Sequence, residues 1–220
     1  MKIDCISDLH GHYPKLEGGD LLIVAGDLTA RDSYDEYDKF FDWLIHQDYE
    51  KAIVIAGNHD NKLKEGHIPI LSFDGFRMSE VEYICDSGSE FEGLKIWGSP
   101  WTTKFPGINP HCCAFTVDTD EELAEKWALI PYDIDILITH CPPWGIFDSV
   151  KRGNIGTYIE TGSKSLRNKV MGMPNLKFHV FGHIHEHGGK VLQTNLPTFI
   201  NVSHVNEKYE PVNGPVRINL

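Results

Sequence analysis

The sequence predicts a single α/β domain built around largely parallel β-sheet. Short runs rich in Val, Ile and Leu alternate with amphipathic segments of helical period, which is the pattern of strands joined by helical crossovers. The runs are apolar at consecutive positions, as expected of strands that are covered on both faces. The 220 residues contain no Pro/Ser-rich linker, so we expect one domain over residues 1–220.

Five of the apolar runs end in side chains that can bind a metal ion. The runs are 2–10, 20–28, 51–60, 133–140 and 176–185, and they end, in order, in Asp8 and His10; in Asp27; in Asn58, His59 and Asp60; in His140; and in His183 and His185. Sites in open α/β sheets lie beyond the carboxyl ends of the strands. The sequence therefore predicts that these side chains converge on one crevice.

Helices are predicted between some of these strands. In the segment 32–47, Ser33 and Glu36 form a potential capping box. The apolar residues Tyr37, Phe40, Phe41 and Leu44 recur at the helical spacing i, i+3, i+4, i+7. Weaker patterns predict helices over about 119–129 and over about 163–171, the latter ending at Gly172. The segments 94–101, 189–203 and 215–220 have β-type composition, and we expect them in a second sheet.

Composition narrows the class of protein. A formal charge of −12 opposes broad binding to long nucleic acid or to anionic lipid. No apolar run approaches the length of a membrane span, and Asp4 and Asp8 interrupt the N-terminal segment where a secretory signal would be apolar. The five cysteines are odd in number and form no C-x-x-C pair, which favours reduced thiols. We therefore expect a cytoplasmic protein.

Each polar strand end also has a simpler explanation when it is taken alone. Asp27 is compatible with a turn cap, Asn58 with a left-handed turn after Gly57, and His140 with a hydrogen bond to a loop. Alternating histidines usually face water at a strand end, and we expect His187, beyond the run, to be exposed and without a role. The coincidence of five such ends favours a shared site.

The candidate ligands are seven oxygen and nitrogen donors without a thiolate: Asp8, His10, Asp27, Asn58, His140, His183 and His185. This mixture suits divalent ions such as manganese, iron, zinc, nickel or cobalt better than it suits a structural zinc site. Seven ligands exceed one ordinary coordination sphere, so we expect two ions, manganese first among these, with a bridging carboxylate. Two such ions can share a hydroxide and stabilise both the attacking and the leaving oxygen at phosphorus, which predicts phosphoester hydrolysis.

As an ordered set, these motifs resemble those of the calcineurin-like metallophosphoesterases. The matching stretches are Asp8-x-His10, Gly26-Asp27, 57–60, His140 and Gly182-His183-x-His185. The resemblance implies a four-layer α/β/β/α sandwich with the dinuclear centre at one edge of the sheets. It also implies that one metal is held by Asp8, His10, Asp27 and His185, and the other by Asp27, Asn58, His140 and His183, with Asp27 bridging.

The stretches "GSPW", "LITHCPPWGIFD", "HVFGHIHEHGG", "TFINVS" and "PVNGP" are similar to the branch of metallophosphoesterase-domain-containing proteins. That similarity implies hydrolysis of small phosphodiesters such as cyclic nucleotides by attack of a metal-bridging hydroxide. His59 would donate a proton to the departing oxygen, and Asn58 would bind a metal and touch a phosphoryl oxygen. Alternatives are a phosphomonoesterase, a protein phosphatase or nuclease of the same family, and a scaffold that has lost catalysis.

One position departs from the family pattern. Phosphatase members carry an acidic residue after the second motif that orients the catalytic histidine, whereas this sequence has Ala30 there. Asp32 and Asp60 are candidates to replace it, and the departure disfavours strong phosphomonoesterase activity, since an unoriented His59 is a poorer general acid. After the fourth motif, three further side chains are candidates for contact with phosphate or base, or else are part of a solvated surface: Lys151, Arg152 and Lys164.

Overall fold

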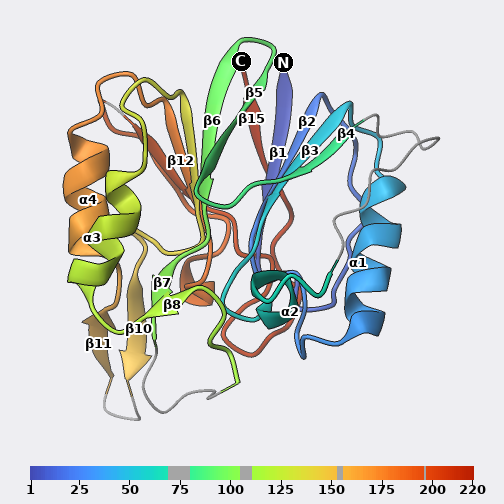
Figure 1. Cartoon of the computed structure of the whole chain (residues 1–220), viewed down its shortest axis with the longest axis horizontal. Coiled ribbons are helices and arrows are strands. Elements are labelled where there is room, and N and C mark those ends of the chain that lie inside the picture. Colours follow the sequence, from blue (N-terminus) through green and yellow to red (C-terminus); the bar gives the residue numbers. More distant parts are fainter. Residues whose placement is uncertain (69–79, 105–110, 153–155, 196) are drawn as a thin grey trace.

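Two β-sheets pack face to face between two helical layers in the computed structural model of the chain (Figure 1). The structure describes residues 1–68, 80–104, 111–152, 156–195 and 197–220. Helix α1 (Tyr34–Ile45) covers the outer face of one sheet, and helices α3 (Asp120–Ala128) and α4 (Lys164–Met171) cover the outer face of the other. The expected four-layer α/β/β/α sandwich is confirmed.

The first sheet is mostly parallel. Its order is β15 (Val216–Asn219), β1 (Lys2–Ile6), β2 (Leu21–Ala25), β3 (Lys51–Ile55) and β4 (Glu80–Tyr83), with only β15 antiparallel to its neighbour. The second sheet has the order β13 (Val191–Leu192), β14 (Thr198–Asn201), β12 (Phe178–Phe181), β9 (Ile136–Thr139), β6 (Leu94–Ser99) and β5 (Ser87–Phe91). Its four inner strands are parallel and both edge strands are antiparallel.

Alternation along the strands builds three apolar clusters. In β2, Leu22 and Val24 face the helix α1, whereas Leu21 and Ile23 face the second sheet. All four side chains are fully buried, and each contributes about 1.5–3 kcal/mol relative to an exposed position. This burial on both faces is why the strands are apolar at consecutive positions.

The predicted helices begin at the capping residues that the sequence indicates. Ser33 and Glu36 make the reciprocal capping box of α1, and Thr119 and Glu122 make that of α3. Ser33 thereby satisfies one of the backbone N–H groups that a helix start leaves free. Helix α4 begins after its cap Ser163 and ends at Gly172, as its sequence pattern predicts.

Small elements project from the carboxyl edge of the sheets. They are helix α2 (Asn61–Lys64), the pair β7 (Thr102–Thr103) and β8 (Thr116–Val117), the hairpin of β10 (Ser149–Arg152) and β11 (Thr157–Glu160), and a 3-10 turn at His185–His187. None of the helices in the described ranges is long and apolar enough to span a bilayer.

One expected pairing is wrong. The segments 94–101 and 189–203 contribute strands to the second sheet as predicted, but 215–220 forms β15, which lies beside β1 in the first sheet. Its alternating pattern, with Val216 and Ile218 packed in the core between the sheets, suits an edge strand of either sheet. The pattern therefore predicts a strand without identifying its partner.

Candidate metal centre

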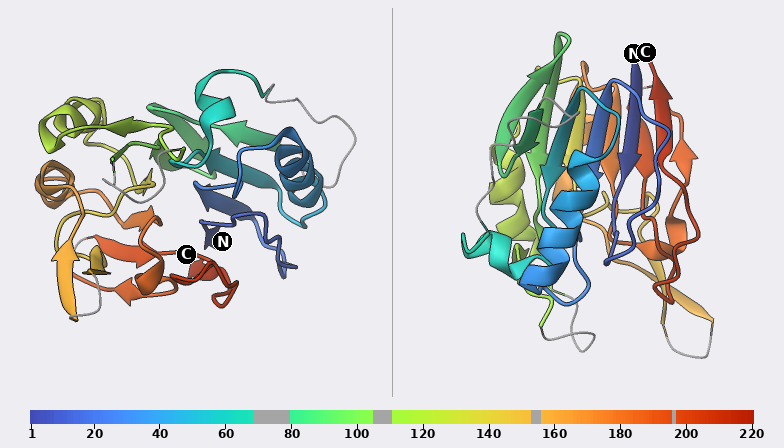
Figure 2. Two further views of the ribbon diagram at one scale, coloured as in Figure 1. Left: turned by 90° about the horizontal axis from the view of Figure 1, so that it is seen from below. Right: turned by 90° about the vertical axis from the view of Figure 1, so that its right-hand side faces the viewer.

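The predicted ligands come together at the carboxyl edge of both sheets, opposite the labelled chain ends of Figure 1. Strands β1, β2 and β3 of the first sheet lead to Asp8 and His10, Asp27, and Asn58, while β9 and β12 of the second sheet lead to His140 and to His183 and His185. The left view of Figure 2 looks onto the molecule from this side. The site thus spans the junction of the two sheets.

One cluster of ligand atoms contains Asp8, His10 and His185. Their ligand atoms all lie within 4.8 Å of one another. The Nε2 atoms of His10 and His185 are 3.3 Å apart, and Nε2 of His185 is 3.2 Å from Oδ1 of Asp8. The other carboxylate oxygen of Asp8 accepts hydrogen bonds from the hydroxyls of Ser7 and Ser203, at 2.5 and 2.8 Å, so Oδ1 is directed toward the two imidazoles.

A second cluster contains Asp27, His140 and His183, again with ligand atoms within 4.8 Å of one another. Nε2 of His140 lies 3.4 Å from Oδ2 of Asp27 and 3.1 Å from Oδ1 of Asn58. The Nδ1 atom of His140 lies 3.0 Å from the carbonyl of Ala25. Because a carbonyl only accepts, Nδ1 carries the proton and the Nε2 lone pair faces the cluster.

Asp27 connects the two clusters. Its Oδ2 atom lies 3.6 Å from Nε2 of His10, in the first cluster, as well as facing His140 of the second. Its Oδ1 atom accepts a hydrogen bond of 2.9 Å from the backbone N–H of His59. This is the position that a bridging carboxylate requires.

The backbone at the ligands is unusual and is fixed by close packing. Four ligands have positive φ values: Asp8, His10, Asp27 and His183, at 51°, 44°, 52° and 70°. Such values are uncommon outside glycine and cluster at functional sites. A Cβ at Gly57 would lie 2.2 Å from Oδ1 of Asp27, and one at Gly182 would lie 2.3 Å from Oδ2 of Asp8, so only glycine lets these carboxylates approach the turns.

Burial and neighbouring charges prepare the donors for metal binding. Burial lowers the pKa of His10 and of His183 to about 3, so both are neutral at pH 7. Burial alone would raise the pKa of Asp27, but the imidazoles of His140, His59 and His10 outweigh it and hold this pKa well below its ordinary value. Burial lowers the pKa of His140, but Asp27 outweighs burial and raises it to about 9. A cation would take the place of that proton.

The arrangement fits two transition-metal ions. The donors are imidazole nitrogens, carboxylate oxygens and one amide oxygen, in clusters that Asp27 connects, and this donor set suits borderline and hard divalent cations. Two such cations would also neutralise Asp8 and Asp27, which are buried and which, within the described part of the chain, have only histidines as partners for charge.

His59 belongs to a third group of potential ligand atoms, with His10 and Asp27, and its Nδ1 atom is held by groups other than the candidate acids Asp32 and Asp60. Its Nε2 atom is 3.9 Å from Oδ2 of Asp27, and its Nδ1 atom is 3.2 Å from the carbonyl of Ala30 and 3.3 Å from Sγ of Cys112. The carboxylate of Asp60 accepts from the backbone N–H groups of residues 28, 29 and 57. The backbone carbonyl at Ala30 therefore occupies the role that an acidic side chain would have there.

The Asp32 carboxylate serves other partners as well. It accepts a hydrogen bond of 2.8 Å from the hydroxyl of Tyr37 and pairs with Lys62 at 3.2 Å.

Sequence reasoning missed Cys112, because its contact with His59 joins residues 53 positions apart and no motif contains it.

A cleft of about 270 Å³ opens over the clusters. Its floor includes Asp27, Asn58, His59, His183 and His185. Its walls come from β7, β8 and the turn before β8, the β10–β11 hairpin, the segment 184–186 and the C-terminal loop: Thr103, Cys112, Thr116, Val150, Lys151, Ile184, Glu186, Glu207 and Tyr209. This set includes Tyr209, for which the sequence offered no signal.

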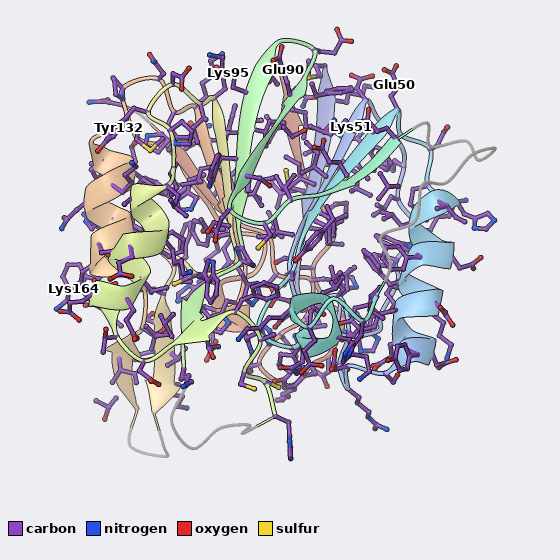
Figure 3. The ribbon with its side chains drawn as sticks, in the orientation of Figure 1. Glu50, Lys51, Glu90, Lys95, Tyr132 and Lys164 are labelled. Atoms are coloured by element: carbon purple, nitrogen blue, oxygen red, sulfur yellow. The ribbon has the colours of Figure 1, made fainter. Side chains whose placement is uncertain are left out.

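The additional candidates fall in different places. Lys151 lines the cleft, whereas Lys164 lies on the outer helical layer, over the ring of Trp144 (Figure 3). Arg152 lies in β10, and its side chain is outside the described part of the structure. The expectation of an exposed His187 is wrong: this side chain is half-buried, and its Nε2 atom lies 2.9 Å from the hydroxyl of Ser149, which ties the 3-10 turn to the hairpin.

Comparison with known proteins identifies the family. The profile described as "Calcineurin-like phosphoesterase" matches residues 1–187. The chain belongs to this family. It is 35% identical over 237 aligned positions to the human protein "Metallophosphoesterase domain-containing protein 1", an alignment that covers 98% of this chain and 70% of the relative.

Solved structures of similar fold support the architecture. The crystal structure of the Thermus thermophilus protein TT1561 aligns with a TM-score of 0.60 at 15% identity, covering 93% of this chain and 89% of that one. The phosphopantetheinyl hydrolase of Mycobacterium tuberculosis aligns with a TM-score of 0.58 at 17% identity, covering 94% and 90%. Family membership makes the chain a metal-dependent phosphoesterase whose Asp/His clusters suit a dinuclear centre.

Proposed function

We propose that this phosphoesterase is a phosphodiesterase for small substrates, with cyclic nucleotides among them. The observation that carries the proposal is the pair of ligand clusters joined through Asp27, with the ring of His59 beside them in the same cleft. An in-line displacement at phosphorus needs positive charge that binds the phosphoryl oxygens, and it needs a proton donor for the leaving oxygen.

The ligand assignment is part of this proposal. Asp8, His10, Asp27 and His185 would hold one ion, and Asp27, Asn58, His140 and His183 the other, with manganese as the expected metal. When bound, such ions polarise the phosphoryl group and activate water at neutral pH. Asn58 would also approach a phosphoryl oxygen, since its side chain lines the cleft.

His59 would supply the proton to the leaving oxygen. Its Nδ1 atom faces the carbonyl of Ala30, which can only accept, so Nδ1 keeps its proton. The Nε2 atom is then the nitrogen that exchanges a proton with a ligand in the cleft. In the imidazolium form it would donate to the departing alkoxide, and it lies 3.9 Å from Oδ2 of Asp27.

The charge of the cleft walls favours diesters over monoesters. Among the described wall residues, Lys151 carries a positive charge and Glu186 and Glu207 carry negative ones. A phosphomonoester is close to a dianion at pH 7, whereas a diester carries one charge, so the walls disfavour the former more strongly. The net charge of −12 likewise disfavours long nucleic acid.

The retained His59 and the complete ligand set support an enzyme over a scaffold of the same fold. A cytoplasmic location stays a prediction, based on five cysteines that are all free thiols.

The test is an activity panel on protein that has been dialysed free of metal and reconstituted with manganese, iron, zinc, nickel or cobalt. Substrates are p-nitrophenyl phosphate, bis-p-nitrophenyl phosphate, and 2′,3′- and 3′,5′-cyclic nucleotides, with elemental analysis of each preparation. We expect about two ions per chain and faster hydrolysis of diesters than of the monoester. A ratio at or below one ion per chain contradicts the dinuclear centre, and a preference for the monoester contradicts the phosphodiesterase.

A further inference from the structure

Tyr209 lies over the histidines of the metal centre. Its ring centroid is 4.9 Å from that of His10, 5.2 Å from that of His185 and 6.5 Å from that of His59, and the first two contacts are edge-on at 79° and 87°. The side chain lines the cleft while 45% of the residue stays exposed. The ring therefore stands between the floor of the cleft and solvent, where a substrate must pass or rest.

The loop that carries Tyr209 is fixed by its own hydrogen bonds. The side-chain oxygen of Asn206 accepts from the backbone N–H groups of Lys208 and Glu210, and the N–H of Tyr209 donates to the carbonyl of Asn206. At the base of the loop, the amide of Asn213 donates to the carbonyl of Ser203. These bonds hold the loop in place without a ligand.

The backbone of Tyr209 has a φ of 61°. An aromatic residue is rarely found in this left-handed region, and such outliers are retained mainly at functional sites. Glycine or asparagine would adopt this conformation with less strain. Phe115 and Phe147 also have positive φ values, at 49° and 53°, so the position of the ring over the histidines, and not the φ value alone, points to a role for Tyr209.

Among the residues that the structure describes, the rest of the cleft wall is poor in positive charge. Glu186 and Glu207 stand against Lys151, so the part of a substrate beyond its phosphorus meets carboxylates and an aromatic face. Such a wall suits an uncharged, flat organic group that carries hydrogen-bond donors, and it disfavours a second phosphate.

We propose that Tyr209 is the specificity-determining residue of the site, and that its ring stacks against a flat heterocyclic base attached through a sugar to the scissile phosphodiester. The proposal deepens the phosphodiesterase function proposed above and rests on it. It adds the residue by which the site would prefer a nucleotide diester to a diester of an aliphatic alcohol.

The test compares how three ligands bind to manganese-loaded protein. Adenosine 5′-monophosphate, ribose 5-phosphate and inorganic phosphate are titrated by calorimetry into the wild type, Tyr209→Leu and Tyr209→Phe. Tyr132→Leu is the matched control, because Tyr132 is similarly exposed at 58% but lies away from the carboxyl edge (Figure 3). We expect Tyr209→Leu to weaken the nucleotide about 5- to 150-fold, the range for stacking of one base on an aromatic side chain. Tyr209→Phe and Tyr132→Leu should bind it as the wild type does.

Affinities for ribose 5-phosphate and inorganic phosphate should stay unchanged in every variant. Equal weakening of all three ligands in Tyr209→Leu, with metal content reduced, would show that Tyr209 only supports the ion ligands and would overturn the proposal. Unchanged nucleotide affinity would overturn it as well. Because binding is measured without turnover, a protein that binds the nucleotide through Tyr209 but hydrolyses no diester in the activity panel would contradict the phosphodiesterase function while leaving this contact established.

Discussion

Replacement of Asp27 by asparagine tests whether this side chain is needed for metal binding or for folding. One oxygen of Asp27 accepts the N–H of His59 at 2.9 Å, and the other faces Nε2 of His140 and of His10 at 3.4 and 3.6 Å. Asparagine has nearly the same volume and keeps an acceptor for His59. Its NH₂ group, however, has neither a charge nor a lone pair for an ion, so we expect Asp27→Asn to fold and to lose the bridge.

The expected size of the effect follows from mass action. An ion that binds only the folded chain stabilises it by about 2.7 kcal/mol when its free concentration is 100 times Kd, so two ions contribute about 5 kcal/mol. In a chain of this length, 1 kcal/mol shifts Tm by about 2–4 °C. We therefore expect manganese to raise the Tm of the wild type by about 10–20 °C, and that of Asp27→Asn by less than about 5 °C.

The assay is thermal unfolding followed by circular dichroism, with and without manganese. Asp4→Asn provides a matched control, because Asp4 is equally buried on the same strand, β1, that leads to Asp8 but pairs with Arg217 at 2.8 Å away from the ligands. Loss of that pair should lower Tm without changing the shift that manganese causes. A full manganese shift in Asp27→Asn would refute the bridging assignment, and an unfolded variant would mean that Asp27 is structural.

Three further predictions concern buried or cleft-facing side chains. His59→Ala should keep both ions but lose about 10²–10⁴-fold in rate, more on cyclic nucleotides than on bis-p-nitrophenyl phosphate, whose leaving group needs no proton; equal losses would indicate phosphate binding. Cys112→Ala removes the thiol 3.3 Å from Nδ1 of His59 and should lower kcat about two- to tenfold, the worth of one weak hydrogen bond. Cys113→Ala, at the exposed neighbour, should have no effect, and an equal loss in both variants would contradict the contact. Burial lowers the pKa of His179 from 6.5 to about 3, so its neutral form stabilises the fold above pH 6.5 and this stability is lost as the pH falls toward 3. The free energy of unfolding, measured with urea on metal-free wild type and on His179→Leu, should then depend on pH with slopes that differ by up to about 1.4 kcal/mol per pH unit in this window. Equal pH dependence of the two proteins would contradict the assignment.

The reason for the His179 prediction lies in its hydrogen bonds. The hydroxyl of Thr139 donates to the carbonyl of Cys141, so it accepts from Nε2 of His179 at 2.8 Å. The Nδ1 atom finds no partner within the described part of the chain. A proton on Nδ1 would therefore place an unpaired charge in the core.

Local patterns in the sequence were enough to place most of the fold. The strands that lead to Asp8, Asp27, Asn58 and His140 are buried on both faces, which makes most of their positions apolar, and the box of Ser33 with Glu36 is complete within four residues. Such features depend on neighbours in the chain, and they are visible before folding. The convergence of the ligands followed from the rule that strand ends share one edge.

The features that the sequence did not predict depend on contacts between distant segments. The hydroxyl of Ser203 donates to Asp8 from 195 positions away, and Tyr209 reaches the histidines through a loop that belongs to no motif. The partner of β15 was misassigned because an edge strand has the same alternation in either sheet. The group that orients His59 is a backbone carbonyl at Ala30, which no side-chain pattern can indicate.

The position of the centre at the junction of the two sheets has a mechanical consequence. Asp8 and His185 stand 177 residues apart in the chain, so an ion held by both would act as a cross-link between its two halves. A covalent link that closes a loop of this length restricts the unfolded chain by about 5 kcal/mol in the chain-entropy description. All five cysteines of the protein are free thiols, so coordination would supply a cross-link that needs no oxidation. A chelator would remove this cross-link reversibly.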